Sequence, residues 1–249
     1  MRIVYSLLAA AFIALAGYAG GQVEGLRFLF GAVLPYLAMV VFLAGVSWRV
    51  VSWSLSAVPF RIPATCGQQK SLPWLPQAKL DNPSTTLGVI GRMALEILLF
   101  RSLFRNTKAE LRQGPRLVFS EAKLLWLAAL AFHWTFLIIF LRHLRFFLEP
   151  VPAWVAALQT IDGFFQVGAP VLFATDIIIL AALGFLLWRR FADPQVRYIS
   201  LFTDYFALFL LIGLALSGVL MRYFTRVDVT AVKQLALGLV TFSPVIPAE

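Results

Sequence analysis

The feature that most constrains this chain is a series of long apolar runs, each close to the length needed to cross a bilayer. A membrane-spanning helix needs about 20 consecutive, mostly apolar residues. Charged residues make up only 13% of the 249 residues, against about 25% in a typical soluble domain. The sequence therefore predicts an all-α integral membrane protein with its helices in a bundle. The expected spans are residues 3–19, 28–48, 124–147, 166–188 and 199–223.

Residues 57–120 separate the second and third expected spans and are far more polar. Within them, residues 85–104 form a run long enough to span, but Arg92, Glu96 and Arg101 would be costly in lipid. We expect this run to be an amphipathic helix lying in the cytoplasmic interface, followed by a solvated loop. The chain thus divides into two N-terminal spans (1–56), a cytoplasmic loop with an interfacial helix (57–120) and a second helical domain (121–249).

The distribution of basic residues predicts how the chain is oriented. Segment 57–120 holds nine Lys or Arg and three acids, whereas segment 148–165 holds no Lys or Arg and two acids. Because basic loops favour the cytoplasm, we expect a multi-pass protein with the N-terminus and residues 57–120 inside. A signal-peptide cleavage site near "ALAG" (14–17) is the alternative for the first helix, but its single Arg2 favours a retained span.

The net charge and the cysteine count exclude other functions. The net charge is +9, but the basic residues lie between apolar runs and do not form an exposed basic and aromatic face, so nucleic-acid binding is not expected. The single cysteine, Cys66, excludes an internal disulfide and a cysteine-held iron–sulfur cluster within this chain. Any such cluster belongs to a partner.

Both histidines of the chain, His133 and His143, lie ten residues apart in the third expected span. On a helix this spacing gives about 15 Å of rise and leaves the rings about 80° apart in projection. They cannot share one metal ion, but each could ligate a separate haem iron. A hydrogen bond to a neighbouring helix is the structural alternative. A proton relay with Asp176 and Asp204 is a second functional one.

The sequence "FHWTFLIIFLRHLRFFLEP" (132–150) resembles the first haem-binding helix of the gamma (cytochrome b) subunit family of nitrate reductase, the NarI-like family. "LLWRRFADPQVR" (186–197) is similar to the end of that family's next helix and the loop after it. "VPFRIPATCGQQKSLPW" and "KLDNPSTTLGVIGRMALEILLFRSLFRNT" look instead like DsrM, the membrane cytochromes b of the Dsr complex (DsrMKJOP).

The resemblance implies a diheme b-type cytochrome in a prokaryotic inner membrane. It implies electron exchange between menaquinone or ubiquinone and a cytoplasmic iron–sulfur partner resembling DsrK and heterodisulfide reductase, together with other Dsr subunits. Such a chain would be the electron-transfer subunit of a quinone-linked oxidoreductase in dissimilatory sulfur metabolism. The alternatives are a transporter-like subunit that uses His and Asp as a proton relay, and a haem-free membrane anchor.

Three residues match the family's site residues. His133 and His143 match its two haem ligands on the first ligand helix, and Arg190 matches its arginine near a haem propionate. A positive-inside anchor is the alternative role for Arg190. The family's quinol-site lysine has no counterpart, because no lysine lies between Lys123 and Lys233.

The family takes its two remaining haem ligands from a final helix that bears two more histidines. This chain reaches Glu249 before any such helix. The simplest explanation is a truncated chain. Ligands from another subunit, a five-coordinate haem and loss of one or both haems are the alternatives, and Met221 is a conceivable substitute ligand.

Polar residues near His143 complete the list of candidates. Glu149 and Asp162 could accept protons from a quinol, with loop solvation as the alternative. Arg142 and Arg145 could bind propionates of the haem on His143 or extend to lipid headgroups.

Overall fold

The computed structural model describes residues 1–56, 73–74, 76–77, 79–104, 107–112, 114, 116–166 and 170–247. Two compact units are present: Met1–Ser47 with Ala131–Glu249, and Trp48–Leu130. Cys66 and most of the Pro-rich stretch lie outside the described residues.

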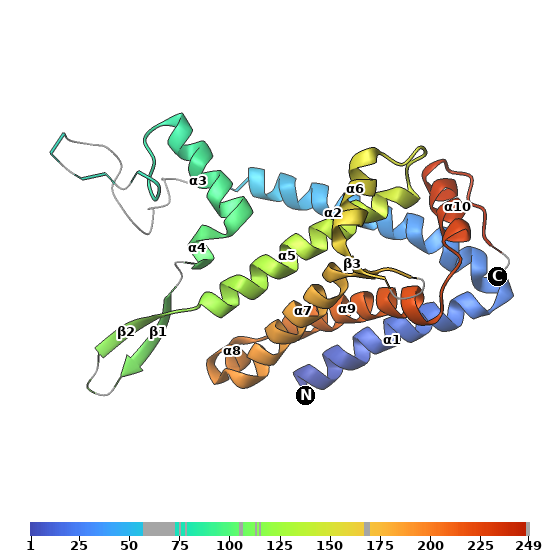
Figure 1. Cartoon of the computed structure of the whole chain (residues 1–249). Helices are drawn as coiled ribbons and strands as arrows, with labels where there is room; N and C mark the ends of the chain where they lie inside the picture. Colours follow the sequence, from blue (N-terminus) through green and yellow to red (C-terminus); the bar gives the residue numbers. More distant parts are fainter. Residues whose placement is uncertain are drawn as a thin grey trace. The chain divides into compact units, whose positions relative to one another are not determined.

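The elements are mainly helices, with two short hairpins (Figure 1). In chain order they are α1 (Arg2–Gln22), η1 (Glu24–Leu26), η2 (Leu29–Val33), α2 (Leu34–Ser54), α3 (Thr86–Leu99), α4 (Arg101–Phe104), β1 (Thr107–Arg112), β2 (Arg116–Glu121), α5 (Lys123–His143), η3 (Leu144–Phe146), α6 (Ala153–Asp162), β3 (Gly163–Phe165), β4 (Leu172–Phe173), α7 (Ala174–Ala192), α8 (Pro194–Ile199), α9 (Phe202–Val219), η4 (Leu220–Phe224) and α10 (Val229–Val240).

Among the described residues, four helices are long and apolar enough to cross a membrane: Arg2–Gln22, Glu24–Ser54, Lys123–Phe146 and Phe202–Phe224. They correspond to the first, second, third and fifth expected spans. The all-α membrane class predicted from the sequence is confirmed.

The fourth expected span, residues 166–188, is shifted along the chain. Its helix, α7, begins at Ala174 because β3 and β4 pair in an antiparallel hairpin just before it. With 19 residues, α7 rises about 28 Å. It carries Asp176 in its first turn and two arginines, Arg189 and Arg190, in its last, so it is less apolar than the other four.

Regular secondary structure also forms in segments that the sequence predicts to be loops. The loop at residues 105–116 contributes to a hairpin, in which β1 and β2 pair from Thr107–Glu121 to Arg112–Arg116. Gly114 lies in the turn with φ +81°, a conformation that side chains disfavour. Two further helices, α6 and α10, were missed because each is only 10 to 12 residues long. Asp228 caps α10 by accepting a hydrogen bond from the Thr230 amide at 2.8 Å.

In the unit 48–130, the expected amphipathic run is interrupted at Phe100. Thr85 caps α3 by accepting from the Gly88 amide at 3.1 Å, and Phe100 ends the helix in a left-handed conformation with φ 49°. Glu96 then caps α4 by accepting from the Ser102 hydroxyl at 2.6 Å and the Ser102 amide at 2.9 Å. These hydrogen bonds, with Arg92 and Arg101 nearby, lower the pKa of Glu96. The interfacial position of α3 stays a prediction.

In the other unit, α9 packs along α1 on one side and α7 on the other (Figure 1). Ile179, Leu183 and Leu208 form the buried core, and α5 contributes Phe132 and Ile139 to its edge. On the faces that point away from this core, α1 and α9 expose large apolar side chains, such as Phe12 and Leu214. Such surfaces suit contact with lipid rather than water.

The hydrogen bonds within this unit define its two ends. The amino-terminal ends of α1 and α9 meet, because the guanidinium of Arg2 donates to the Ser200 carbonyl at 3.2 Å and the Ser6 hydroxyl donates to the Phe202 carbonyl at 2.9 Å. At the opposite end, Arg142 of α5 donates to Thr175 of α7 at 3.2 Å. We call the first the Arg190 end, because Arg190 also contacts Ser200 there, and the second the His143 end, because His143 directly follows Arg142.

Candidate functional site

Both histidines lie on α5, on faces that the rest of the unit leaves uncovered. Phe132 and Ile139 pack on the core, and Thr135 and Arg142 are buried. His133 and His143 each follow one of these inward residues by one position, a rotation of about 100°, and both side chains are exposed. The ten-residue interval lies within one unbroken α-helix, so the rise and angle expected from the sequence apply.

The imidazole of His143 is held by its own helix. Its Nδ1 lies 2.7 Å from the carbonyl oxygen of Ile139, which can only accept a hydrogen bond. In the neutral imidazole, Nδ1 therefore carries the proton and Nε2 keeps its lone pair. This is the arrangement in which a backbone carbonyl orients a metal-ligating histidine.

The ring of His133 stacks edge-on against Phe132, with centroids 4.9 Å apart. His143 has a similar neighbour in Phe146, at 5.7 Å. Each imidazole thus contacts one aromatic ring and is exposed. Among the described residues, no three His, Cys, Asp or Glu side chains are grouped to hold a metal ion.

A buried ion pair lies beside His143, at the end of α5. Arg142 pairs with Asp162, and both residues are less than 10% exposed. Asp162 also accepts from the Thr175 hydroxyl at 2.6 Å and from the Thr175 amide at 3.0 Å. The Arg142 guanidinium lies 3.6 Å from the ring centroid of Phe173. The alternative of loop solvation for Asp162 is wrong, and so is the extension of Arg142 to headgroups, because both residues are buried against each other and against Thr175 and Phe173.

A second polar group adjoins this pair. The Tyr223 hydroxyl donates to Asp176 at 2.6 Å and accepts from the Phe173 amide at 3.2 Å. Arg222 donates to the Val171 carbonyl at 3.1 Å and lies 4.1 Å from the Phe173 ring centroid. Asp176 therefore has a tyrosine partner from η4 that lies 47 residues away in the sequence.

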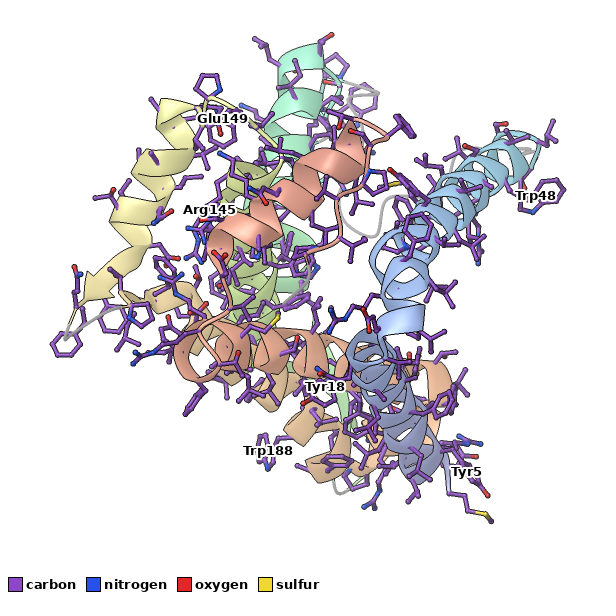
Figure 2. The ribbon with its side chains drawn as sticks, turned by 90° about the vertical axis from the view of Figure 1, so that its right-hand side faces the viewer. Tyr5, Tyr18, Trp48, Arg145, Glu149 and Trp188 are labelled. Carbon is purple, nitrogen blue, oxygen red and sulfur yellow. The ribbon has the colours of Figure 1, made fainter. Side chains whose placement is uncertain are left out.

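Two other charged residues at the His143 end also find partners. Arg145 donates to Gln159 of α6 at 2.8 Å. Glu149 forms an ion pair with Lys233, because α10 packs against η3. Figure 2 shows Arg145 and Glu149 close to this part of the unit. The only lysine after Lys123 is thus brought to the end of the histidine helix from 90 residues beyond His143.

Arg190 lies at the other end of the unit, at the last turn of α7. It donates to the Ser200 hydroxyl at 2.7 Å and lies 3.8 Å from Asp204. Asp204 also accepts from the Leu201 amide at 2.8 Å, so it lies in the first turn of α9 and caps the start of the span. The structure thus separates the two aspartates: Asp204 stabilises a helix end, whereas Asp176 is bound to a tyrosine hydroxyl.

Fold and site together define a multi-pass helical membrane protein that presents two imidazoles on one span. The chain belongs to the nitrate reductase gamma subunit family, which matches residues 88–246. The family resemblance noted from the sequence is confirmed, and the match extends through α10.

Two curated relatives are similar over most of the chain. The "Hdr-like menaquinol oxidoreductase cytochrome b-like subunit" of Archaeoglobus fulgidus is 44% identical over 219 residues, covering 86% of this chain and 65% of the relative. The protein of the same name from Archaeoglobus profundus is 41% identical over 218 residues, covering 86% and 64%. The chain therefore spans about two thirds of the length of these relatives. No solved structure matches it.

Proposed function

We propose that this chain is the b-type cytochrome subunit of a quinol-linked oxidoreductase and that α5 holds haem through His133 and His143. The observation that carries the proposal is the hydrogen bond from His143 Nδ1 to the Ile139 carbonyl, since it presents Nε2 as a ligand. Membership of the nitrate reductase gamma subunit family and the cytochrome b-like name of both relatives support it.

The residues present fit haem ligation. Each histidine offers one exposed imidazole beside an aromatic ring, and the two are too far apart along the helix, at about 15 Å, to serve the same iron. Both rings lie on exposed positions of α5. A bound haem supplies one-electron chemistry, and the protein sets its potential through ligand, hydrogen bonds and burial.

We infer the kind of quinone and the kind of partner from the names of the two relatives. Their name supports menaquinol as the electron donor or acceptor and a heterodisulfide-reductase-like protein as the partner. We propose that the partner is a cytoplasmic iron–sulfur subunit resembling DsrK, in dissimilatory sulfur metabolism, and that other Dsr subunits join it.

We propose that Arg190 contacts a propionate of the haem on His133. Its side chain is only half-buried, and it uses one hydrogen bond to Ser200, so further donors remain for a carboxylate. We also propose that the Arg190 end, which carries the N-terminus and the basic loop 189–198, faces the cytoplasm of a prokaryotic inner membrane.

Absorbance of the full-length protein in isolated membranes tests the proposal. The reduced wild type should show b-haem bands, and His133→Ala and His143→Ala should each remove about half of the haem. Asp204→Asn, which changes a helix cap, should retain all of it. A colourless wild-type protein that still supports its partner's activity would contradict the proposal and favour the haem-free anchor or the proton relay.

A further inference from the structure

A cavity of about 320 Å³ lies at the Arg190 end, where α1 meets the start of α9. Its lining residues are Met1, Arg2, Ile3, Arg197, Ser200 and Tyr205. Because a water molecule occupies about 30 Å³ of liquid volume, the cavity has room for a group the size of about ten waters. Ser200 and Tyr205 form a buried floor, and the two arginines are exposed at its rim.

The charge of the cavity has one sign. Arg2 uses one of its donors on the Ser200 carbonyl and keeps the rest. The guanidinium of Arg197 makes no hydrogen bond or ion pair with any part of the chain that the structure describes, although its backbone amide donates to the Asp193 carbonyl at 2.9 Å. No acid is among the lining residues. The two nearby acids are engaged at helix starts, since Asp193 accepts from the Gln195 amide at 3.0 Å and Asp204 from the Leu201 amide at 2.8 Å. The cavity therefore favours an anion.

Exposed aromatic residues place this cavity at the depth of lipid headgroups. Tyr5, Trp188 and Tyr198 are 58%, 60% and 85% exposed, respectively. Figure 2 shows Tyr5 and Trp188 toward the same end of the unit, with Tyr18 farther along α1. Tyrosine and tryptophan gather where the hydrocarbon of a bilayer meets its headgroups. The rim arginines are thus within reach of lipid phosphates.

We propose that this cavity binds the phosphate and headgroup of one anionic phospholipid and that the lipid joins α1 to the α8–α9 connection. Arg2 belongs to α1 and Arg197 to α8, so a phosphate between their guanidiniums would bridge these two helices. Without the lipid, the hydrogen bond from Arg2 to the Ser200 carbonyl is the link at the rim. The apolar wall formed by Met1 and Ile3 is suited to the glycerol and upper acyl carbons. This inference does not rest on the proposed electron-transfer function.

Native mass spectrometry of the purified, delipidated protein in neutral detergent tests it. The probes are phosphatidylglycerol, phosphatidylcholine and inorganic phosphate, each added separately. We expect one phosphatidylglycerol to be retained at least fivefold more tightly than phosphatidylcholine. Arg197→Gln should weaken that retention about fivefold, which corresponds to about 1 kcal/mol at 1.4 kcal/mol per tenfold change.

Two further variants control for folding and for charge. Ile3→Trp keeps every arginine but fills the cavity, so it should reduce retention as well. Arg189→Gln removes one positive charge near the same end from a residue outside the lining, so it should leave retention unchanged. The proposal would be overturned if both lipids were retained equally, or if Arg189→Gln and Arg197→Gln lost phosphatidylglycerol equally. It would also be overturned if the protein retained inorganic phosphate but not phosphatidylglycerol.

Discussion

The ion pair of Arg142 and Asp162 is the residue-scale feature that shapes the His143 end. Arg142 immediately precedes His143, and its contacts with Asp162, Thr175 and Phe173 fix the direction of the last turn of α5. Because each turn of a helix rotates as a rigid body, fixing Arg142 also fixes the direction in which His143 leaves the helix. We therefore regard Asp162 as a residue that positions the proposed ligand.

Replacing Asp162 with Asn should lower the free energy of unfolding by about 3–5 kcal/mol, because it leaves a buried guanidinium without its counter-charge. Unfolding in mixed detergent micelles would measure this. Glu149→Gln breaks an ion pair whose carboxylate is 64% exposed, so it should cost about 0–1 kcal/mol. Equal effects of the two substitutions would contradict the burial assigned to the Arg142–Asp162 pair.

The sequence indicates both histidines but not this pair. No local pattern links Arg142 with Asp162, because their contact depends on α6 turning back toward α5. Lys233 and Glu149, and Tyr223 and Asp176, were missed for the same reason. Lys233 lies 84 residues from Glu149 in the sequence, and Tyr223 lies 47 residues from Asp176.

At the scale of elements, α10 is shaped by one glycine. A Cβ on Gly238 would meet the Ser243 oxygen at 2.8 Å and the Val245 nitrogen at 3.0 Å, which are backbone atoms that cannot rotate away. The Ser243 amide donates to the Gly238 carbonyl at 2.8 Å. The chain after α10 can therefore fold back along the helix only if residue 238 lacks a side chain.

Gly238→Ala should destabilise the protein by about 1–3 kcal/mol through this overlap. The matched control is Gly213→Ala in α9, where a Cβ meets nothing within 4 Å. That change should be neutral or stabilise by up to about 1 kcal/mol, because alanine favours helix. Thermal unfolding of both variants in the same detergent would decide the matter, and a stable Gly238→Ala protein would contradict the close packing.

The junction of α3 and α4 should depend on pH through Glu96. The ionised carboxylate is the acceptor for Ser102, and its folded-state pKa is lowered. The stabilisation is therefore complete above the unfolded pKa of about 4.3 and is lost as pH falls through the folded pKa. The protection factor of the Ser102 amide, which is the intrinsic exchange rate at a given pH divided by the observed rate, should fall in acid in the wild type. In Glu96→Ala it should be low at every pH.

At the scale of the whole molecule, the helix directions of the unit 1–47 with 131–249 decide which connections share an end of the unit, while the side of the membrane stays a prediction. The amino-terminal ends of α1 and α9 meet each other and the carboxyl end of α7. The N-terminus and the basic loop 189–198 consequently lie at one end of the unit. The segment 148–165, which lacks Lys and Arg, lies at the other end with Arg142. Basic and acidic connections are separated as orientation in a membrane requires.

Cys66 gives a direct test of sidedness, because it is the single cysteine of the chain. A membrane-impermeant maleimide should label it in inside-out vesicles but not in intact cells. In a Cys66→Ser background, Thr160→Cys, which lies on an exposed position of α6, should show the opposite pattern. Labelling of Cys66 from outside intact cells would contradict the orientation.

The sequence by itself determined the membrane class, the positions of most spans and the paired histidines, because apolar run length and helical spacing are local properties. The exact start of α7, the helices α6 and α10, and the polar partners of Asp162, Asp176 and Glu149 were decided only by the tertiary structure. Short helices and ion pairs depend on which distant segment covers them, and a charge in a membrane protein takes whichever partner the packing brings within reach. The same packing leaves both imidazoles of α5 exposed.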